Sequence, residues 1–384
     1  MSCTIVERTL ERKAFVEYCL TGCVGAEARS ASPGEYFAKA AAIAVHRGIQ
    51  IIQEKVYGSL GVKDQVLAAR EQEYRKAGLE APPGVMWLEG TPLSNTGFCG
   101  LQIWGIAPKA SGHTTVATVD GIGGGAPARL WTGPGYRMLY VPSVHGQRLD
   151  GSLPESAEAQ AALMFDNADS VLRSAGFTYS QVIRTWIYLP RILDWYGEFN
   201  RVRTDFYARA GFGRDPGKSP FPASTGIQAR AIPGGECSMD VLALVTADPA
   251  RANAQPIVTT TRQGPAFGYG SAFSRGMSLT LEGRKTVFVS GTASIDAQGN
   301  TLYPGNNEMQ CLETLVNVAA LLEGQGGSLR HIAMATLFCK TKEVLAAYRN
   351  VTRWLQIPEI PTVCVQADVC RADLLVEIEA VAFI

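Results

Sequence analysis

The 384-residue sequence predicts a mixed fold of the α+β or α/β class, built from tandem modules that each pack helices on one face of a mixed sheet. Two observations carry this prediction. Residues 180–245 and 329–383 share one order of strand, helix, proline-containing loop and strand. Each run also follows a matching apolar strand and amphipathic helix. Such alternation is typical of a mixed sheet with helices on one side.

The first module, residues 1–112, is expected to be a degenerate half-module. Its opening strands are missing from the pattern, and a helix at about 34–45 takes the place of the first helix. The other elements are expected as strands at 48–60, 82–90 and 97–106 and a helix at 63–79. The glycine-rich segment 113–130 marks the end of this module.

The middle module, residues 113–248, contains a complete set of elements. We expect strands at 137–144, 181–190, 221–229 and 236–245 and helices at 159–176 and 194–212. A linker at 246–256 leads to the C-terminal module, residues 257–384. There we expect strands at 285–294, 331–340, 360–370 and 374–383 and helices at 309–326 and 342–356.

Composition favours a small-molecule partner. Lys and Arg together number 35, as do Asp and Glu, so the chain offers no net charge to nucleic acid or to an anionic membrane. The charged start lacks a signal peptide's apolar run, and no stretch approaches the ~20 apolar residues of a membrane span, which predicts a cytoplasmic protein. Nine cysteines and four histidines show no ligand spacing, so we expect reduced thiols and no metal.

Two acidic residues stand out in the last strand. Glu377 and Glu379 share one face of it, since alternate strand residues point to the same side. They lie either on a solvated face or in a cleft. A partly buried Glu is suited to proton transfer, because burial raises its pKa toward neutrality. Ser143 and His145 could also form a nucleophile and its base, but no acid is placed to orient the histidine.

The modules resemble the Rid superfamily of imine deaminases and relatives, whose members form trimers with clefts between subunits. The resemblance implies a monomer with an internal pseudo-threefold arrangement, or a low-order homo-oligomer. Rid deaminases grip a substrate carboxylate with an Arg at a strand start, and a Glu follows fifteen residues later. Thr362 and Glu377 occupy these positions in the last module, and Ser224 and Ser238 occupy them in the middle one.

A second group on this fold, the chorismatases, matches more closely. The ending ADVCRADLLVEIEAVAF resembles their C-terminal signature, and RTWIY, FPASTGI, AFSRG and VSGTASI resemble further family motifs. These enzymes cleave pyruvate from chorismate and release a hydroxybenzoate or a dihydroxycyclohexadienoate. The sequence departs from the family at Ile187, where an Asn is usual, and after Ile295, where a His-containing stretch is replaced.

The resemblance implies roles for individual residues. Glu377 would protonate the enolpyruvyl methylene group of the substrate. Cys370 and Gly291 occupy the two positions that separate product types, and Cys with Gly goes with 3-hydroxybenzoate. In the absence of such a role, Cys370 would be a small buried apolar residue.

We expect the residues that bind the substrate to lie inside the matched motifs. Arg184, Arg275 and Arg371 are candidates for holding the substrate carboxylates, because the guanidinium group pairs bidentately with them. Tyr188 could donate a hydrogen bond to a substrate oxygen or pack in the core. No metal or organic cofactor is expected, since a carboxylic acid can protonate an enol ether.

We therefore predict an enzyme that eliminates pyruvate from chorismate and favours 3-hydroxybenzoate as product. One alternative is a Rid-superfamily enzyme that acts on another small carboxylate, enamine, imine or biosynthetic intermediate. The other is a non-catalytic regulator that binds a metabolite in the same clefts.

Overall fold

The structure, a computed structural model, describes residues 3–24, 31–80, 84–90, 97–109, 113–120, 126–231 and 234–384. These residues form three mixed sheets, each with two helices. Four short 3-10 helices lie at Leu60–Val62, Tyr179–Gln181, Ala266–Tyr269 and Leu329–His331. Across the described ranges, every helix is too short or too polar to cross a membrane.

The first module has a complete sheet, in the order β1-β2-β5-β3-β4. Its elements are β1 (Ile5–Glu11), β2 (Phe15–Cys23), α1 (Pro33–Arg47), β3 (Gln50–Gly58), α2 (Lys63–Ala77), β4 (Val85–Glu89) and β5 (Phe98–Pro108). The prediction that the opening strands are missing is therefore wrong. Charged residues line the edge strand β1, and the buried strand β2 carries Glu17, so neither reads as an apolar strand in sequence.

The middle module forms a six-stranded sheet in the order β10-β9-β11-β8-β7-β6. Its elements are β6 (Thr115–Val119), β7 (Ala128–Gly133), β8 (Tyr136–His145), α3 (Ala157–Ser174), β9 (Val182–Tyr188), α4 (Ile192–Arg209), β10 (Ala223–Ile227) and β11 (Ser238–Thr246). The strands and helices expected between residues 137 and 245 are all present.

The third module also has six strands, in the order β12-β13-β14-β17-β15-β16. Its elements are β12 (Ala252–Ile257), β13 (Gly276–Leu281), β14 (Arg284–Ala293), α5 (Asn307–Glu323), β15 (Ile332–Cys339), α6 (Lys342–Trp354), β16 (Thr362–Gln366) and β17 (Val376–Phe383). The segment expected to be a linker contributes β12, so the third sheet begins before residue 257.

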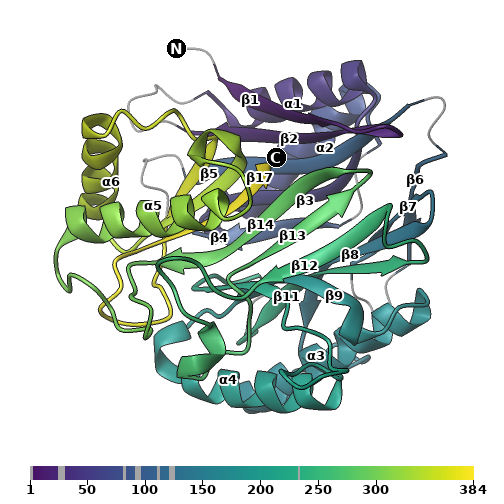
Figure 1. Cartoon of the computed structure of the whole chain (residues 1–384). Coiled ribbons are helices and arrows are strands. Elements are labelled where there is room, and N and C mark those ends of the chain that lie inside the picture. Colours follow the sequence, from purple (N-terminus) through teal and green to yellow (C-terminus); the bar gives the residue numbers. More distant parts are fainter. Residues whose placement is uncertain are drawn as a thin grey trace.

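The three sheets share one topology. The strands β2-β5-β3-β4, β8-β11-β9-β10 and β14-β17-β15-β16 each contain two antiparallel pairings followed by a parallel one. The helix pairs α1 and α2, α3 and α4, and α5 and α6 lie on the outside of the molecule, and the strands face its middle (Figure 1). The predicted tandem fold with helices on one face of each sheet is confirmed.

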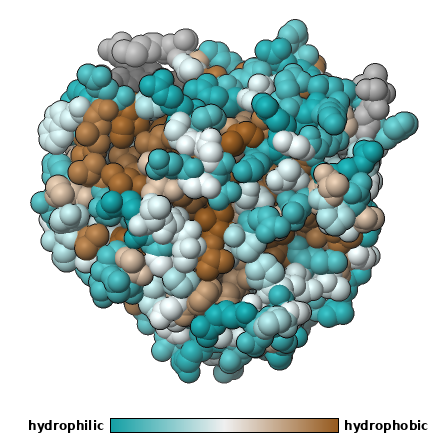
Figure 2. Space-filling model, viewed as in Figure 1, coloured by the Kyte–Doolittle hydropathy of each residue, from teal (hydrophilic) through white to brown (hydrophobic). Residues whose placement is uncertain are grey.

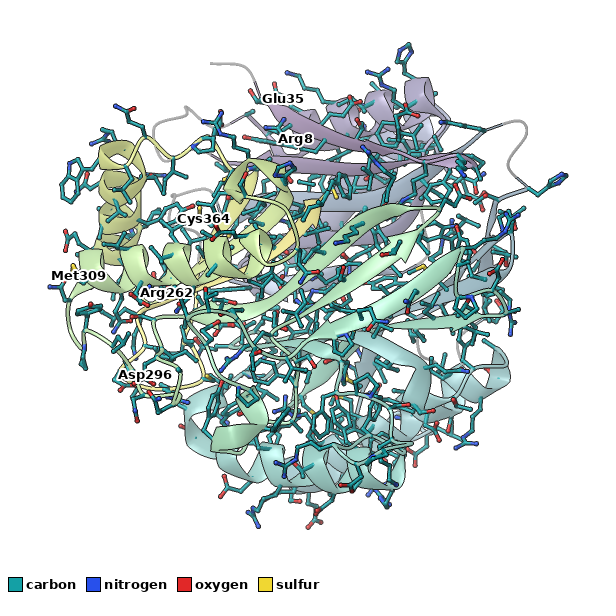
Figure 3. All side chains as sticks on the ribbon, viewed as in Figure 1. Arg8, Glu35, Arg262, Asp296, Met309 and Cys364 are labelled. Carbon is teal, nitrogen blue, oxygen red and sulfur yellow. The ribbon has the colours of Figure 1, made fainter. Side chains whose placement is uncertain are left out.

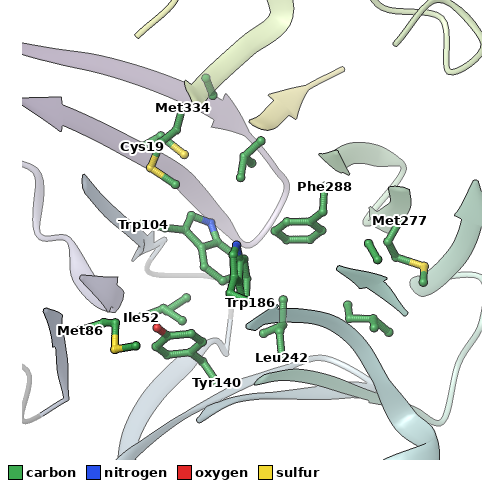
Figure 4. Packing of buried hydrophobic residues seen from close by; sticks show 14 of the residues in the cluster. Cys19, Ile52, Met86, Trp104, Tyr140, Trp186, Leu242, Met277, Phe288 and Met334 are labelled. Atoms are coloured by element: carbon green, nitrogen blue, oxygen red, sulfur yellow. The ribbon is translucent and has the colours of Figure 1, made fainter. Parts of the chain in front are cut away.

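Apolar residues between the sheets hold the modules together. Each sheet buries one face under its own helices, whereas the opposite faces share a single central cluster. Trp104 of β5, Trp186 of β9 and Phe288 of β14 meet there in edge-to-face contacts, with ring centroids 5.8 and 6.4 Å from that of Phe288 (Figure 4). Each of the three sheets contributes one of these rings, so no single module contains this core.

The modules meet at three similar junctions. The edge strand β10 packs on β14, β16 packs on β2, and β4 packs on β8. We call these the β10–β14, β16–β2 and β4–β8 junctions. Each one places the edge strand of one sheet against a strand inside the next sheet, and together they close a ring.

Candidate active site

A pocket of about 550 Å³ opens at the β10–β14 junction. It lies between the middle and third modules. Residues from α4, β10, β14, β17, the 3-10 helix at Ala266–Tyr269 and three loops of the third module line it. The structure brings five of the predicted residues together here: Cys370, Gly291, Arg275, Arg371 and Glu377.

Glu377 is the acidic residue that lines this pocket. Its strand, β17, runs between β14 and β15, where Glu377 pairs with Ala293 and Phe338. The side chain points away from the helices, and the residue is only 4% exposed. Burial and the neighbouring Glu379 raise the pKa of Glu377 to about 8, although Arg184 opposes them. The carboxyl group is therefore protonated at neutral pH and able to donate a proton.

Gly291 lies directly against the side chain of Glu377. The pairing of β14 with β17 is irregular between Val289 and Thr292, which places Gly291 in a bulge. A Cβ atom at position 291 would overlap the Oε1 atom of Glu377. Glycine therefore leaves the space that the carboxyl group occupies.

Three guanidinium groups surround the pocket. Arg275 donates from Nε to the carbonyl of Gly264 (2.9 Å) and from Nη1 to the hydroxyl of Tyr269 (2.8 Å). Arg371 donates to the carbonyl of Gly299, and Arg203 donates to Asn200. Within the described part of the chain, Nη2 of Arg275 and Nε of Arg203 are buried without a hydrogen-bond partner. No carboxylate of the described residues forms a salt bridge with these three arginines.

Cys370 and two tyrosines complete the walls. Cys370 lies in the loop between β16 and β17 rather than in a strand, and burial raises its pKa to about 12. Its thiol is therefore neutral. It can line the pocket or donate a weak hydrogen bond, but it cannot act as a thiolate nucleophile. Tyr196 and Tyr269 present their rings to the same space, and burial raises the pKa of both.

Two of the predicted residues, Arg184 and Tyr188, lie outside this pocket. Arg184 donates from Nη2 to Thr225 (2.6 Å) and to Glu379 (3.0 Å), so its charge is already paired. Tyr188 is 1% exposed and packs toward Lys55, whose Nζ lies 6.0 Å from the ring centroid. Strand alternation puts both side chains on the inner face of β9, which faces the centre of the ring rather than the junction.

Glu379 belongs to this central polar cluster as well. Burial acts to raise the pKa of Glu379, but the positive charges of Lys55 and Arg184 hold this pKa below its ordinary value. The carboxylate lies 3.5 Å from Nζ of Lys55 and accepts a hydrogen bond from Thr336. The two glutamates therefore share one face of β17 as predicted, but one is neutral in a pocket and the other is ionised in a paired cluster.

The sequence analysis missed three pocket residues. Arg203 and Tyr196 come from α4, and Tyr269 comes from the 3-10 helix at Ala266–Tyr269. Arg203 is 1% exposed although it lies on a helix whose other arginines are exposed or half-exposed. The spacing of Tyr196 and Arg203 in the sequence could have indicated these two residues, because seven positions apart on a helix places them on one face.

Ser143 and His145 do form a hydrogen-bonded pair, away from Glu377. The Ser143 Oγ and His145 Nε2 atoms are 3.1 Å apart, and Ser143 has a φ of 54°. Burial lowers the pKa of His145 to about 4, so the ring is neutral. Its buried Nδ1 atom has no hydrogen-bond partner among the described residues, so the third member of a triad is missing there.

Comparison with known proteins agrees with this architecture. Residues 137–246 and 271–384, more than half of the chain, match the model of the family described as Endoribonuclease L-PSP, which is the Rid family. A 3-hydroxybenzoate synthase of Streptomyces hygroscopicus is 28% identical over 258 residues, which cover 60% of this chain and 70% of that protein. A chorismatase of Streptomyces rapamycinicus is 25% identical over 336 residues, which cover 80% and 96%.

A solved structure shows the same fold over almost the whole chain. The crystal structure of a chorismatase aligns with 97% of this chain and 100% of its own, with a TM-score of 0.60 and 19% sequence identity. The family match and this fold confirm the resemblance on which the sequence prediction rests. The chain therefore belongs to the Endoribonuclease L-PSP (Rid) family.

Proposed function

We propose that this chain converts chorismate by eliminating pyruvate and that 3-hydroxybenzoate is the product. The observation that carries the proposal is a buried, neutral carboxylic acid, Glu377, in a pocket with three arginines. The names of the curated relatives, 3-hydroxybenzoate synthase and chorismatase, support the choice of substrate.

Glu377 is the proton donor in this proposal. The enolpyruvyl group of chorismate is an enol ether, and protonation of its methylene carbon generates a cation at the ether carbon. The bond between the ring and the ether oxygen then breaks, and pyruvate leaves. For 3-hydroxybenzoate, the oxygen of the neighbouring ring hydroxyl bonds to the carbon that the ether oxygen leaves, and its bond to the neighbouring carbon breaks. The carbon that now carries the oxygen loses its hydrogen as a proton while the ring becomes aromatic, and the Glu377 carboxylate can accept this proton. Because its pKa is about 8, Glu377 can both lose and regain a proton near neutral pH.

The arginines supply the binding energy for a dianion. Chorismate carries one carboxylate on its ring and one on its side chain. Arg203, Arg275 and Arg371 line one pocket and form no salt bridge with a described carboxylate, so their charges are available to a substrate. Tyr269 supports this arrangement, since the guanidinium groups of Arg275 and Arg371 lie 5.2 and 5.3 Å from its ring centroid.

The preference for 3-hydroxybenzoate rests on Cys370 and Gly291. Chorismate has the composition of a hydroxybenzoate plus pyruvate, so this outcome consumes no water, whereas the dihydroxycyclohexadienoate requires one. Cys370 and Gly291 both line the pocket beside Glu377. We expect Cys370→Ala to shift the product toward the dihydroxycyclohexadienoate, measured as the ratio of the two products by chromatography. An unchanged ratio would contradict a role for Cys370.

The central experiment follows pyruvate release and aromatic products from chorismate. We expect pyruvate and 3-hydroxybenzoate with the wild-type chain and a loss of roughly 10²-fold or more in kcat with Glu377→Gln, because the amide cannot donate a comparable proton. Glu308→Gln is the matched control, since Glu308 is exposed on α5. Wild-type protein without pyruvate release, or a Glu377→Gln variant as active as the wild type, would overturn the proposal.

A further inference from the structure

The β16–β2 junction repeats the geometry of the candidate active site with different chemistry. In the third sheet Glu377 pairs with Ala293, and at the related place in the first sheet Gly100 pairs with Cys23. This junction therefore has a glycine in place of the acid and a cysteine in place of Ala293. A second cysteine, Cys364, lies on the edge strand β16 that packs on β2.

A pocket of about 960 Å³ opens at this junction, and both cysteines line it. Its other walls include Val6, Ile357 and Ile360, which are apolar. Apolar side chains gather on the side of the molecule where α6 lies (Figure 2), and Cys364 lies there beside the strands of the first module (Figure 3). Six of the nine cysteines are buried, whereas Cys23 and Cys364 are partly exposed.

The two cysteines line one pocket from strands that pack against each other across the junction. The neighbouring Cys364, helped by the charge of Arg349, lowers the pKa of Cys23. The same interaction raises the pKa of Cys364. Cys23 is thus the better nucleophile of the pair, and Cys364 stands next to it as a resolving thiol.

We propose that Cys23 and Cys364 are a dithiol site that low-molecular-weight disulfides oxidise to a reversible cross-link between the first and third modules. The Cys23 thiolate attacks one sulfur of the small disulfide, the S–S bond breaks, and a small thiolate leaves. Cys364 then loses its proton to solvent and attacks the Cys23 sulfur, which releases the second small thiolate. Two protein thiols are oxidised, and one small disulfide is reduced to two thiols.

The cross-link would act on the whole ring. Cys23 and Cys364 lie near opposite ends of the sequence, so a bond between them ties almost the entire chain into one loop. Closure of so long a loop restricts the unfolded state strongly. We expect oxidation to raise the Tm by roughly 5 °C, provided that the bond forms without displacing β16.

The test is a peptide map of the full chain after incubation with oxidised glutathione. We expect the loss of two titratable thiols, a peptide pair linked through Cys23 and Cys364, and full reversal by dithiothreitol. With less than one equivalent of iodoacetamide, Cys23 should be alkylated before Cys364. Cys23→Ser and Cys364→Ser should each abolish the linked pair, whereas Cys237→Ser, at a buried cysteine of the middle module, should retain it.

Oxidised wild-type protein without the linked peptide pair would overturn this proposal, as would a Cys23→Ser variant that still loses two thiols. The wild-type map decides the question even where a serine variant fails to fold. The readout is chemical and independent of chorismate turnover, so failure of the proposed enzymatic function would leave this inference intact.

Discussion

At the scale of single residues, Glu377 links the site to the pH dependence of stability. Burial raises its pKa to about 8 from an ordinary value of 4.5, so between these pH values the folded chain holds a proton that the unfolded chain has lost. The free energy of unfolding must therefore fall as pH rises through this window and level off above pH 8. Each unit of pKa displacement corresponds to about 1.4 kcal/mol.

This linkage gives a prediction for Glu377→Gln. The neutral amide does not ionise, so the variant does not lose stability through this position as pH rises. We expect the variant to have a higher Tm than the wild type at pH 8, by several degrees, and a much smaller difference at pH 5. Thermal unfolding at pH 5 and at pH 8, followed by circular dichroism, measures the Tm difference between the two proteins. Glu308→Gln should show neither effect, because Glu308 is exposed. A Tm difference that is equal at the two pH values would show that Glu377 ionises at its ordinary pKa.

Gly291 provides a second residue-scale prediction. Because a methyl group at this position would overlap the Glu377 carboxyl group, Gly291→Ala must displace this group, which we propose as the proton donor. We expect the rate of pyruvate release to fall by about tenfold, since a displacement near 1 Å is costly for proton transfer. Gly61→Ala is the matched control, because no described atom lies within 4 Å of a Cβ placed there. Wild-type rates in Gly291→Ala would refute the steric argument.

At the scale of secondary structure elements, α4 contributes the arginine that the sequence motifs missed. Arg203 and Tyr196 face the pocket from this helix, whereas Arg209, one and a half turns beyond Arg203, faces solvent. We expect Arg203→Lys to raise KM for the dicarboxylate by about tenfold, because lysine cannot make a bidentate contact. Arg209→Lys should leave KM unchanged. Steady-state kinetics of pyruvate release distinguish the two, and equal KM values would exclude Arg203 from substrate binding.

The elements themselves were predicted unevenly, for a physical reason. Helices with an apolar stripe, such as α3 and α5, fall at the expected positions, because their pattern follows from burying one face against a sheet. In contrast, β2 is buried on both sides and still carries Glu17, which accepts hydrogen bonds from Trp104 and Thr286. A strand whose polar residues are satisfied by distant partners has no local signature.

At the scale of the whole molecule, Arg12 joins the first module to the third. It forms a buried ion pair with Glu17, at 2.6 Å, and donates to the carbonyl groups of Leu281 and Arg284 in the turn between β13 and β14. Thr286 of β14 also accepts from Arg12. Because the first and third modules each supply part of this cluster, the cluster can form only when these two modules pack together.

We therefore expect Arg12→Ala to destabilise the chain by about 3 to 5 kcal/mol, since it leaves Glu17 buried without its cation. Urea unfolding measures this loss. Arg8→Ala, at an exposed position on β1, should change the free energy of unfolding by no more than about 0.5 kcal/mol. Similar values for the two variants would show that the cluster does not contribute to closing the ring.

The sequence by itself determined the repeated module, the helices, and a strand that presents two glutamates on one face. These properties are local, because residue spacing and apolar periodicity are sufficient to specify them. Tertiary structure decided which glutamate is neutral: Glu379 meets Lys55 and Arg184 at the centre of the ring, and Glu377 faces a junction. It also excluded Arg184 from the pocket and admitted Arg203. Burial and charge pairing depend on residues far apart in the chain, and only the closed ring of three sheets brings these residues together.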